Sequence, residues 1–246
     1  MYVNILKNMH THLISLLVVV THYYHFVAES FVVNWRTYVS LDTTITPSGI
    51  THLPPVSRII FPHITSGTWR DRAGMNGFFL SSVFPSAAIW NQEEWQSYAH
   101  TEIVYSFDRI VISERVTVAH SPDWHKEWKV PAVSFGLPGS PDWWAPIRRN
   151  ILLNFGWSEK DLTSGMSKGP VITYIARQHT GRSLLEPDHE ALVKALEAMR
   201  DKYHWEVNIA EMEKLTKREQ IELSARTTVM SPTPALPRSL LKSCAL

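Results

Sequence analysis

The stretch VITYIARQHTGRSLLEPDHEALVKALEAMRDKYHWEVNIAEMEKLTKREQIELSARTTVM, residues 171–230, determines the fold class that we expect for this chain. It opens with the apolar run VITYI, and a continuous run of this kind is typical of a strand buried in a parallel sheet. Pro187 then suits the first turn of a helix, with Asp188 and Glu190 near the positive end of its dipole. Apolar residues follow at helical spacing, namely Leu192, Val193, Leu196 and Met199.

The second half of the stretch repeats the pattern. Residues 205–209 alternate between apolar and polar side chains, which predicts a half-buried strand. Thr216 and Glu219 form a capping box, so a helix is expected to begin there. We expect the next strand at residues 227–230. Strands that alternate with helices in this way favour an α/β fold with a doubly wound parallel sheet.

The first 170 residues contain weaker signals of the same kind. Hydrophobic patterning predicts strands at 16–20, 58–63 and 105–111, and helices at 22–39, 92–98 and 148–155. The sequence GMSKGP at 165–170 favours a hinge. We therefore expect an N-terminal domain at 1–165 and a second domain at 166–230.

The last residues, SPTPALPRSLLKSCAL at 231–246, continue none of these patterns and contain three prolines. We expect a disordered tail there and an incomplete second domain. Near the other end, the apolar run at 13–20 is eight residues long. Because a membrane-spanning helix needs about 20 apolar residues, we expect no clear transmembrane or signal segment.

The composition narrows the classes of function. The chain has 24 basic and 23 acidic residues without a basic stripe, which argues against a nucleic-acid partner. Cys244 is the one cysteine, so no internal disulfide can form. The chain has ten tryptophans, which suit either the flat walls of a sugar-binding cleft or the hydrophobic core.

Two arginines follow the strand expected at 171–175. Ligands of open α/β sheets bind beyond the carboxyl ends of the strands. Arg177 and Arg182 are therefore candidates for binding a diphosphate, because the planar guanidinium group can donate two parallel hydrogen bonds to phosphate oxygens. The alternative is that both are solvated loop residues.

A second pair of candidates lies in the helix expected at 22–39. His25 and Glu29 are four residues apart, so they would share a helical face and suit acid–base work or sugar orientation. The alternative is an exposed pair without a function. The charged triplet at 70–72 allows the same two interpretations, ligand contact or surface loop. The histidines near the N-terminus match no zinc pattern, so no metal site is expected.

Several short motifs in this order and spacing resemble the fungal members of glycosyltransferase family 61, which includes the EGF-domain-specific O-linked N-acetylglucosamine transferases. They span most of the chain and are HYYHFVAE at 22–29, WR at 35–36, WRDRAGMN at 69–76, FDRIV at 107–111, IARQ at 175–178 with Arg182, and EQI at 219–221.

The resemblance implies two Rossmann-like domains that face each other across a cleft, the GT-B type. It implies an inverting transferase that moves a sugar from a nucleotide-sugar donor, usually UDP-linked, to a hydroxyl group of a protein or glycan. It also implies that no metal or other cofactor is needed, and that the enzyme works in the lumen of the endoplasmic reticulum or Golgi as a membrane-anchored or soluble protein.

The resemblance also assigns roles to individual residues. It implies that Arg177 and Arg182 contact the donor phosphates, and that Glu219 and Gln220 open a helix that faces the donor. It implies that His25 and Glu29 lie beside the cleft, with Glu29 as the catalytic base or as the group that orients the acceptor hydroxyl.

The chain departs from the family after the strand expected at 227–230. The family continues there with a loop of the type Gly-x-His-Gly-x-Gly, followed by a helix, whereas this chain has the residues 231–246. An incomplete nucleotide site of this kind leaves a second expectation open. The chain would then be a catalytically inactive truncated fragment, or a carbohydrate-binding protein of the same fold.

Overall fold

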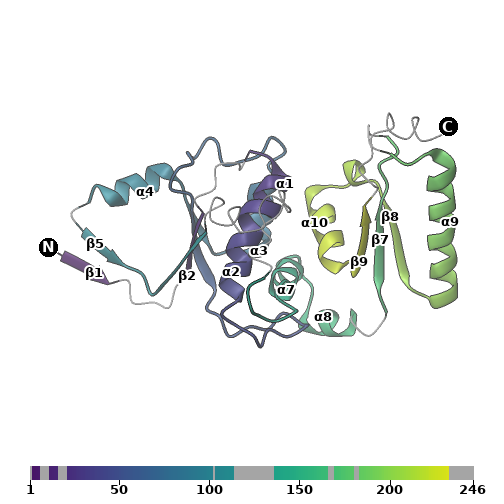
Figure 1. The fold of residues 1–246 in the computed structure, drawn as a ribbon, viewed down its shortest axis with the longest axis horizontal. Coiled ribbons are helices and arrows are strands. Elements are labelled where there is room, and N and C mark those ends of the chain that lie inside the picture. Colours follow the sequence, from purple (N-terminus) through teal and green to yellow (C-terminus); the bar gives the residue numbers. More distant parts are fainter. Residues whose placement is uncertain are drawn as a thin grey trace. The chain divides into compact units, whose positions relative to one another are not determined.

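The computed structural model describes residues 2–5, 11–15, 21–101, 103–113, 136–165, 169–179 and 183–232. The chain forms two compact units, Met1–Asn150 and Ile151–Leu246, and both are α/β with parallel strands (Figure 1). The division falls within helix α7 (Ala145–Asn154). It therefore lies N-terminal to the domain boundary expected at residue 165.

The first unit is built on a four-stranded parallel sheet in the order β4-β3-β2-β6. Its strands are β2 (Thr11–Ser15), β3 (Val56–Ile60), β4 (Ala88–Trp90) and β6 (Arg109–Ser113). If the four strands of this sheet are numbered in chain order, they lie side by side as 3-2-1-4. A doubly wound sheet of the Rossmann type contains the same arrangement. Two further strands, β1 (Tyr2–Ile5) and β5 (Ile103–Ser106), pair separately and are also parallel.

Two of the strands predicted for this unit are not confirmed. The single strand expected at 105–111 is wrong, because the chain forms β5 and β6 with a break at Phe107 and Asp108. Aspartate is unfavourable in strands and common in turns, which explains a break at this point. The strand expected at 16–20 lies outside the described residues; the observed strand, β2, comes directly before it.

The helix predicted at 22–39 is confirmed, but its middle is a π-helix. It consists of α1 (Tyr23–His25), the π-helical segment η1 (Phe26–Phe31) and α2 (Val32–Val39). The segment buries a row of aromatic and aliphatic side chains against the sheet, including Phe26, Phe31, Val33, Trp35, Tyr38 and Val39. Asn34 and Arg36 of α2 are buried as well, so this helix is surrounded by the protein on most sides.

The other helices of the first unit follow the sequence closely. Helix α3 (Met75–Val83) follows the charged triplet at 70–72, and α4 (Gln92–Ala99) matches the helix expected at 92–98. Asn91 and Glu94 form a capping box at the start of α4. A box of this kind satisfies main-chain donors that the first helical turn leaves unpaired.

The loop that follows α2 is organised by the buried carboxylate of Asp42. Its Oδ1 accepts hydrogen bonds from the main-chain nitrogen and the hydroxyl of Thr44, at 2.8 and 2.6 Å. Its Oδ2 accepts from the Thr51 hydroxyl at 2.7 Å and the His52 main-chain nitrogen at 2.9 Å. Hydrogen bonds from the two threonine hydroxyls hold the pKa of Asp42 well below its ordinary value.

We expect this carboxylate to make the first unit acid-labile. Because the folded-state pKa is depressed, the stabilisation is present above the ordinary Asp pKa of about 3.9 and is lost as pH falls through the lower, folded-state value. Asp42→Asn should lower the free energy of unfolding at pH 7 by about 1.5–3 kcal/mol, the range for hydrogen bonds to a charged group. Urea unfolding at pH 7, 5 and 3 measures this effect. An equal loss in the variant and the parent between pH 5 and pH 3 would contradict it.

The second unit contains a three-stranded parallel sheet in the order β8-β7-β9. Its elements are α8 (Glu159–Gly165), β7 (Val171–Ile175), α9 (Glu186–Tyr203), β8 (Glu206–Ala210), the 3-10 turn η2 (Met212–Lys214), α10 (Lys217–Arg226) and β9 (Val229–Pro232). The strands predicted at 171–175 and 205–209 and the helices after Pro187 and Thr216 are thus confirmed, including the capping box of Thr216 and Glu219. The last strand lies two residues later than expected, so Ser231 and Pro232 belong to β9 and not to the tail expected at 231–246.

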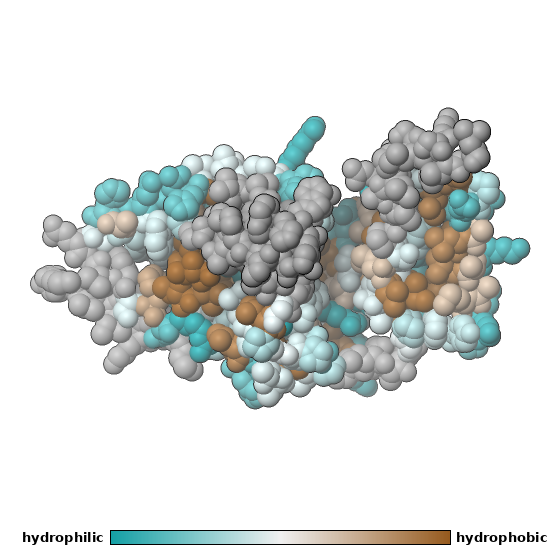
Figure 2. Space-filling view, viewed as in Figure 1, coloured by the Kyte–Doolittle hydropathy of each residue, from teal (hydrophilic) through white to brown (hydrophobic). Residues whose placement is uncertain are grey.

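The core of the second unit lies between β7, β8 and α9. Ile172, Tyr174 and Leu196 are buried there, and Val193 and Met199 of α9 pack against them. Apolar side chains also reach the surface in both units (Figure 2). Among them are Ile110 and Ile112 on β6, and Val229 and Met230 on β9, two strands at the edges of their sheets.

Candidate functional site

The three strands of the second unit end in register at their carboxyl ends. Ile175 of β7 is in register with Ala210 of β8 and with Pro232 of β9. The chain leaves β7 to form β8 on one side and returns to form β9 on the other, so β7 and β9 flank the point where the strand order reverses. Ligands of open α/β sheets bind beyond this point.

Arg177 lies in the loop that begins at this position. It follows β7 by two residues and is partly buried. The loop is tied to the start of α9, because the side chain of Gln178 donates to Glu186 at 3.0 Å and accepts from the main-chain nitrogen of Leu184 at 3.1 Å. Arg182, the other predicted phosphate ligand, lies outside the described residues.

A cluster that the sequence did not predict lies at the same ends of the strands. Glu211, directly after β8, accepts a hydrogen bond from the Lys214 ammonium at 2.8 Å. Its other carboxylate oxygen lies 3.4 Å from Nε2 of His179, in the loop after β7. The Lys214 hydrogen bond holds the pKa of Glu211 below its ordinary value, so the carboxylate is ionised at neutral pH.

A buried tyrosine extends this polar region into the sheet. The hydroxyl of Tyr174, whose side chain is fully buried, lies 3.0 Å from Nδ1 of His189 in the first turns of α9. None of these polar residues repeats at a fixed spacing, so hydrophobic periodicity could not have singled them out. The one available signal was that Gln178 and His179 lie in the sequence shortly after the strand predicted at 171–175, and Glu211 shortly after the strand predicted at 205–209.

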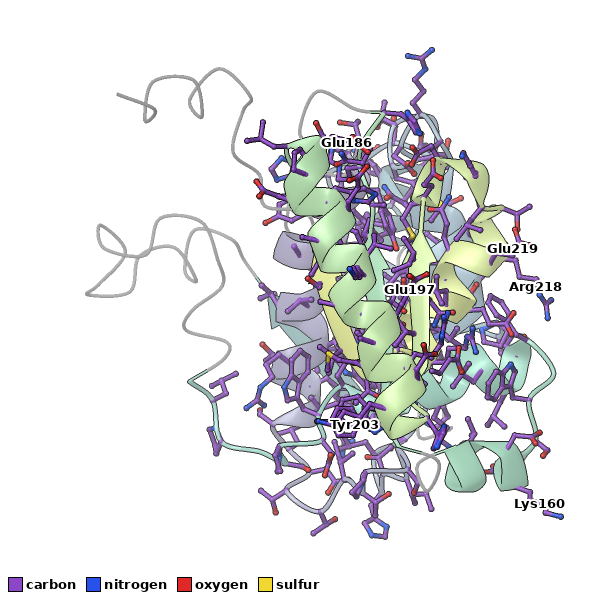
Figure 3. All side chains as sticks on the ribbon, turned by 90° about the vertical axis from the view of Figure 1, so that its right-hand side faces the viewer. Lys160, Glu186, Glu197, Tyr203, Arg218 and Glu219 are labelled. Carbon is purple, nitrogen blue, oxygen red and sulfur yellow. The ribbon has the colours of Figure 1, made fainter. Side chains whose placement is uncertain are left out.

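Glu219 and Gln220 have local contacts that explain their positions. Glu219 accepts hydrogen bonds at 2.7 Å from the main-chain nitrogen and the hydroxyl of Thr216, and these bonds hold its pKa below the ordinary value. Gln220 donates to the main-chain carbonyls of Met212 and Leu215, both at 3.0 Å. Both side chains stabilise the turn into α10, and Figure 3 shows Glu219 on the outer side of that helix.

In the first unit, His25 lies in the helical segment that follows β2. Its ring centroid is 5.3 Å from that of His22 and 5.4 Å from that of Tyr24, both in edge-to-face geometry. His22 caps the helix by accepting a hydrogen bond from the Tyr24 main-chain nitrogen at 3.3 Å. Glu29 belongs to the π-helical segment, and its side chain lies outside the described part of the structure.

The charged triplet at 70–72 also has structural contacts. Asp71 accepts a hydrogen bond from the Asn76 main-chain nitrogen at 2.8 Å and so fixes the start of α3. Burial and the charge of Asp71 raise the pKa of Tyr23, so Tyr23 is protonated and neutral. Arg70 lies over the Trp69 ring at 4.7 Å.

The described residues contain neither a cluster of metal ligands nor a helix that could span a membrane. Their His, Cys, Asp and Glu side chains form no group of three that could hold a metal ion. Every helix in the described ranges is too short or too polar to cross a membrane.

Comparisons with known proteins leave the chain without an assigned relative. No family model matches the sequence. No curated protein and no solved structure is significantly similar to it. The assignment of a function therefore depends on the sequence motifs and on the geometry described above.

Proposed function

We propose that this chain is an inverting glycosyltransferase of the family 61 type. It transfers a sugar from a nucleotide-sugar donor, a UDP-sugar, to a hydroxyl group of a protein or glycan. The two α/β units act as the two Rossmann-like domains of a GT-B enzyme that face each other across a cleft. In this proposal the enzyme needs no metal and works in the endoplasmic reticulum or Golgi lumen.

The position of Arg177 is the observation that supports the proposal most directly. It lies two residues after the end of β7, beside the point where the strand order of the sheet reverses, which is where open α/β sheets bind ligands. A guanidinium group there can neutralise the diphosphate of the donor and of the leaving group. Arg182, from the same loop of the sequence, supplies the second cation.

The reaction follows from these roles. Glu29 takes the proton from the acceptor hydroxyl, and His25 orients the acceptor. The hydroxyl oxygen then attacks the anomeric carbon while the bond from that carbon to the phosphate oxygen breaks, which inverts the configuration. UDP leaves with the bonding electron pair, and Arg177 stabilises the charge that develops on it.

The proposal predicts that UDP stabilises the chain against heat. At a hundredfold excess of UDP over its dissociation constant, ligand linkage adds about 2.7 kcal/mol to the free energy of unfolding. We expect this stabilisation to saturate with UDP concentration and to vanish in the double variant Arg177→Ala/Arg182→Ala. Differential scanning fluorimetry measures both effects.

Arg200→Ala is the matched control, because Arg200 is an exposed arginine on α9 of the same unit. Its response to UDP should equal that of the parent chain. The proposal is wrong if the folded parent shows no response, or if the double variant responds as the parent does. A UDP response without turnover of any UDP-sugar would favour a binding protein of the same fold.

A further inference from the structure

A groove runs along the second unit between β8 and α10. Its volume is about 670 Å³, and its described walls are β8, the segment from Glu211 to Leu215, one face of α10 and Trp157. This volume lies within the range of about 300–1,000 Å³ that is usual for small-molecule sites. The described lining does not include Arg177, so the groove is separate from the predicted phosphate contacts.

Trp157 presents a fixed aromatic wall to this groove. Its indole Nε1–H donates to Oε1 of Glu222 on α10 at 2.9 Å. Its main-chain nitrogen donates to the carbonyl of Leu152 at 3.0 Å, across a turn in which Gly156 has a φ of +96°. Because both ends of the residue are held, the ring is orientated before any ligand arrives, which reduces the entropic cost of binding.

The positive charges near the groove are already neutralised. Lys214 lies 2.8 Å from a carboxylate oxygen of Glu211. Arg226 lies 2.7 Å from a carboxylate oxygen of Glu206, which also accepts a hydrogen bond from Asn208 at 3.0 Å. A phosphate or carboxylate ligand would have to break these pairs, so the groove does not suit an anion.

The same side chains suit hydroxyl groups. Paired carboxylates keep free lone pairs that can accept hydrogen bonds from a ligand, and the amide of Asn208 can both donate and accept. An aromatic ring packs against the apolar face of a sugar ring while polar neighbours bind its hydroxyls. A rigid indole beside paired charges is the combination that a neutral sugar requires.

We propose that the groove between β8 and α10 binds a neutral oligosaccharide, with Trp157 as the stacking platform. Glu219, which is predicted on the donor side, also lines the groove, whereas Arg177 does not. The proposed site binds sugar without nucleotide, so its occupancy can be measured apart from the donor phosphate contacts. Its occupant is a glycan segment that carries no phosphate or carboxylate.

Saturation-transfer NMR with chitotriose, xylotriose and maltotriose tests the proposal on the full chain. We expect at least one trisaccharide to bind, and Trp157→Ala to weaken that binding by about tenfold or more, as the loss of an aromatic contact implies. Tyr203→Ala is the matched control, because Tyr203 is an exposed aromatic residue on α9 outside the groove lining. Its affinity should equal that of the parent chain.

A second measurement avoids dependence on the folding of the alanine variant. The Trp157 indole N–H signal, identified by its loss in Trp157→Phe, should shift when the parent chain is saturated with the bound trisaccharide. The proposal is overturned if no trisaccharide binds the folded parent chain, if Trp157→Ala binds as tightly as the parent, or if the indole signal stays in place at saturation. The UDP experiment gives a separate readout, so either proposal can fail alone.

Discussion

Phe26→Ala is expected to lower the free energy of unfolding of the first unit by about 3–5 kcal/mol, the range for a buried Phe→Ala substitution. The Phe26 side chain is 1% exposed, and its ring centroid is 6.3 Å from that of Phe61. It lines a void of about 10 Å³ together with Leu13 of β2 and Ile59 of β3. Truncation enlarges this void at the surface where the helix meets the sheet, so it removes contacts on both elements.

Tyr24→Ala is the matched control for this prediction. Tyr24 lies in the same helical segment but is 57% exposed. Its replacement should change the free energy of unfolding by no more than about 0.5 kcal/mol, as is usual for surface positions. Urea unfolding monitored by circular dichroism measures both variants. Equal losses in the two variants would contradict the packing of Phe26 against the sheet.

Gly49→Ala is expected to destabilise the first unit by about 2–5 kcal/mol, the sum of backbone strain and overpacking. Gly49 has a φ of +82°, a conformation that residues with a Cβ rarely adopt. A Cβ at this position would lie 2.5 Å from the carbonyl oxygen of Ala145 and 2.9 Å from Cβ of Arg149. Main-chain and Cβ atoms cannot rotate away as a flexible side chain can, so the loop or α7 must shift.

Gly67→Ala separates this effect from the general effect of adding a methyl group. A Cβ at Gly67 would meet no atom within 4 Å, and the residue lies outside the left-handed region. Its replacement should be neutral or stabilise the chain by a few tenths to about 1 kcal/mol, because it restricts the unfolded state. Thermal and urea unfolding compare the two variants. A Gly49→Ala variant as stable as Gly67→Ala would show that Ala145 does not lie against the loop.

Local signals predicted much of the fold. The strand at 171–175 was found as a continuous apolar run, and the start of α10 as the capping box of Thr216 and Glu219. Each signal arises within one strand or one helical turn, where neighbouring residues decide the hydrogen bonding. The single strand expected at 105–111 was wrong, because the chain breaks at Asp108 into β5, which pairs with β1, and β6, which pairs with β2.

The candidate site was predicted only in part, for the same reason. The sequence identified Arg177 from its position after a strand, which is a local property. It did not identify the contact of Glu211 with His179, at 3.4 Å, because these residues follow different strands. It also did not show that Gln220 donates to the main-chain carbonyls of Met212 and Leu215 before α10.

The sequence by itself determined the type and order of most elements, the apolar face of α9 and the α/β class. Apolar periodicity and helix caps specify these features over a few residues. The tertiary structure alone decided that β7 lies between β8 and β9, and therefore that His179, which follows β7, lies 3.4 Å from Glu211, which follows β8. Strand order is set by pairing between residues far apart in the chain, and no local pattern records it.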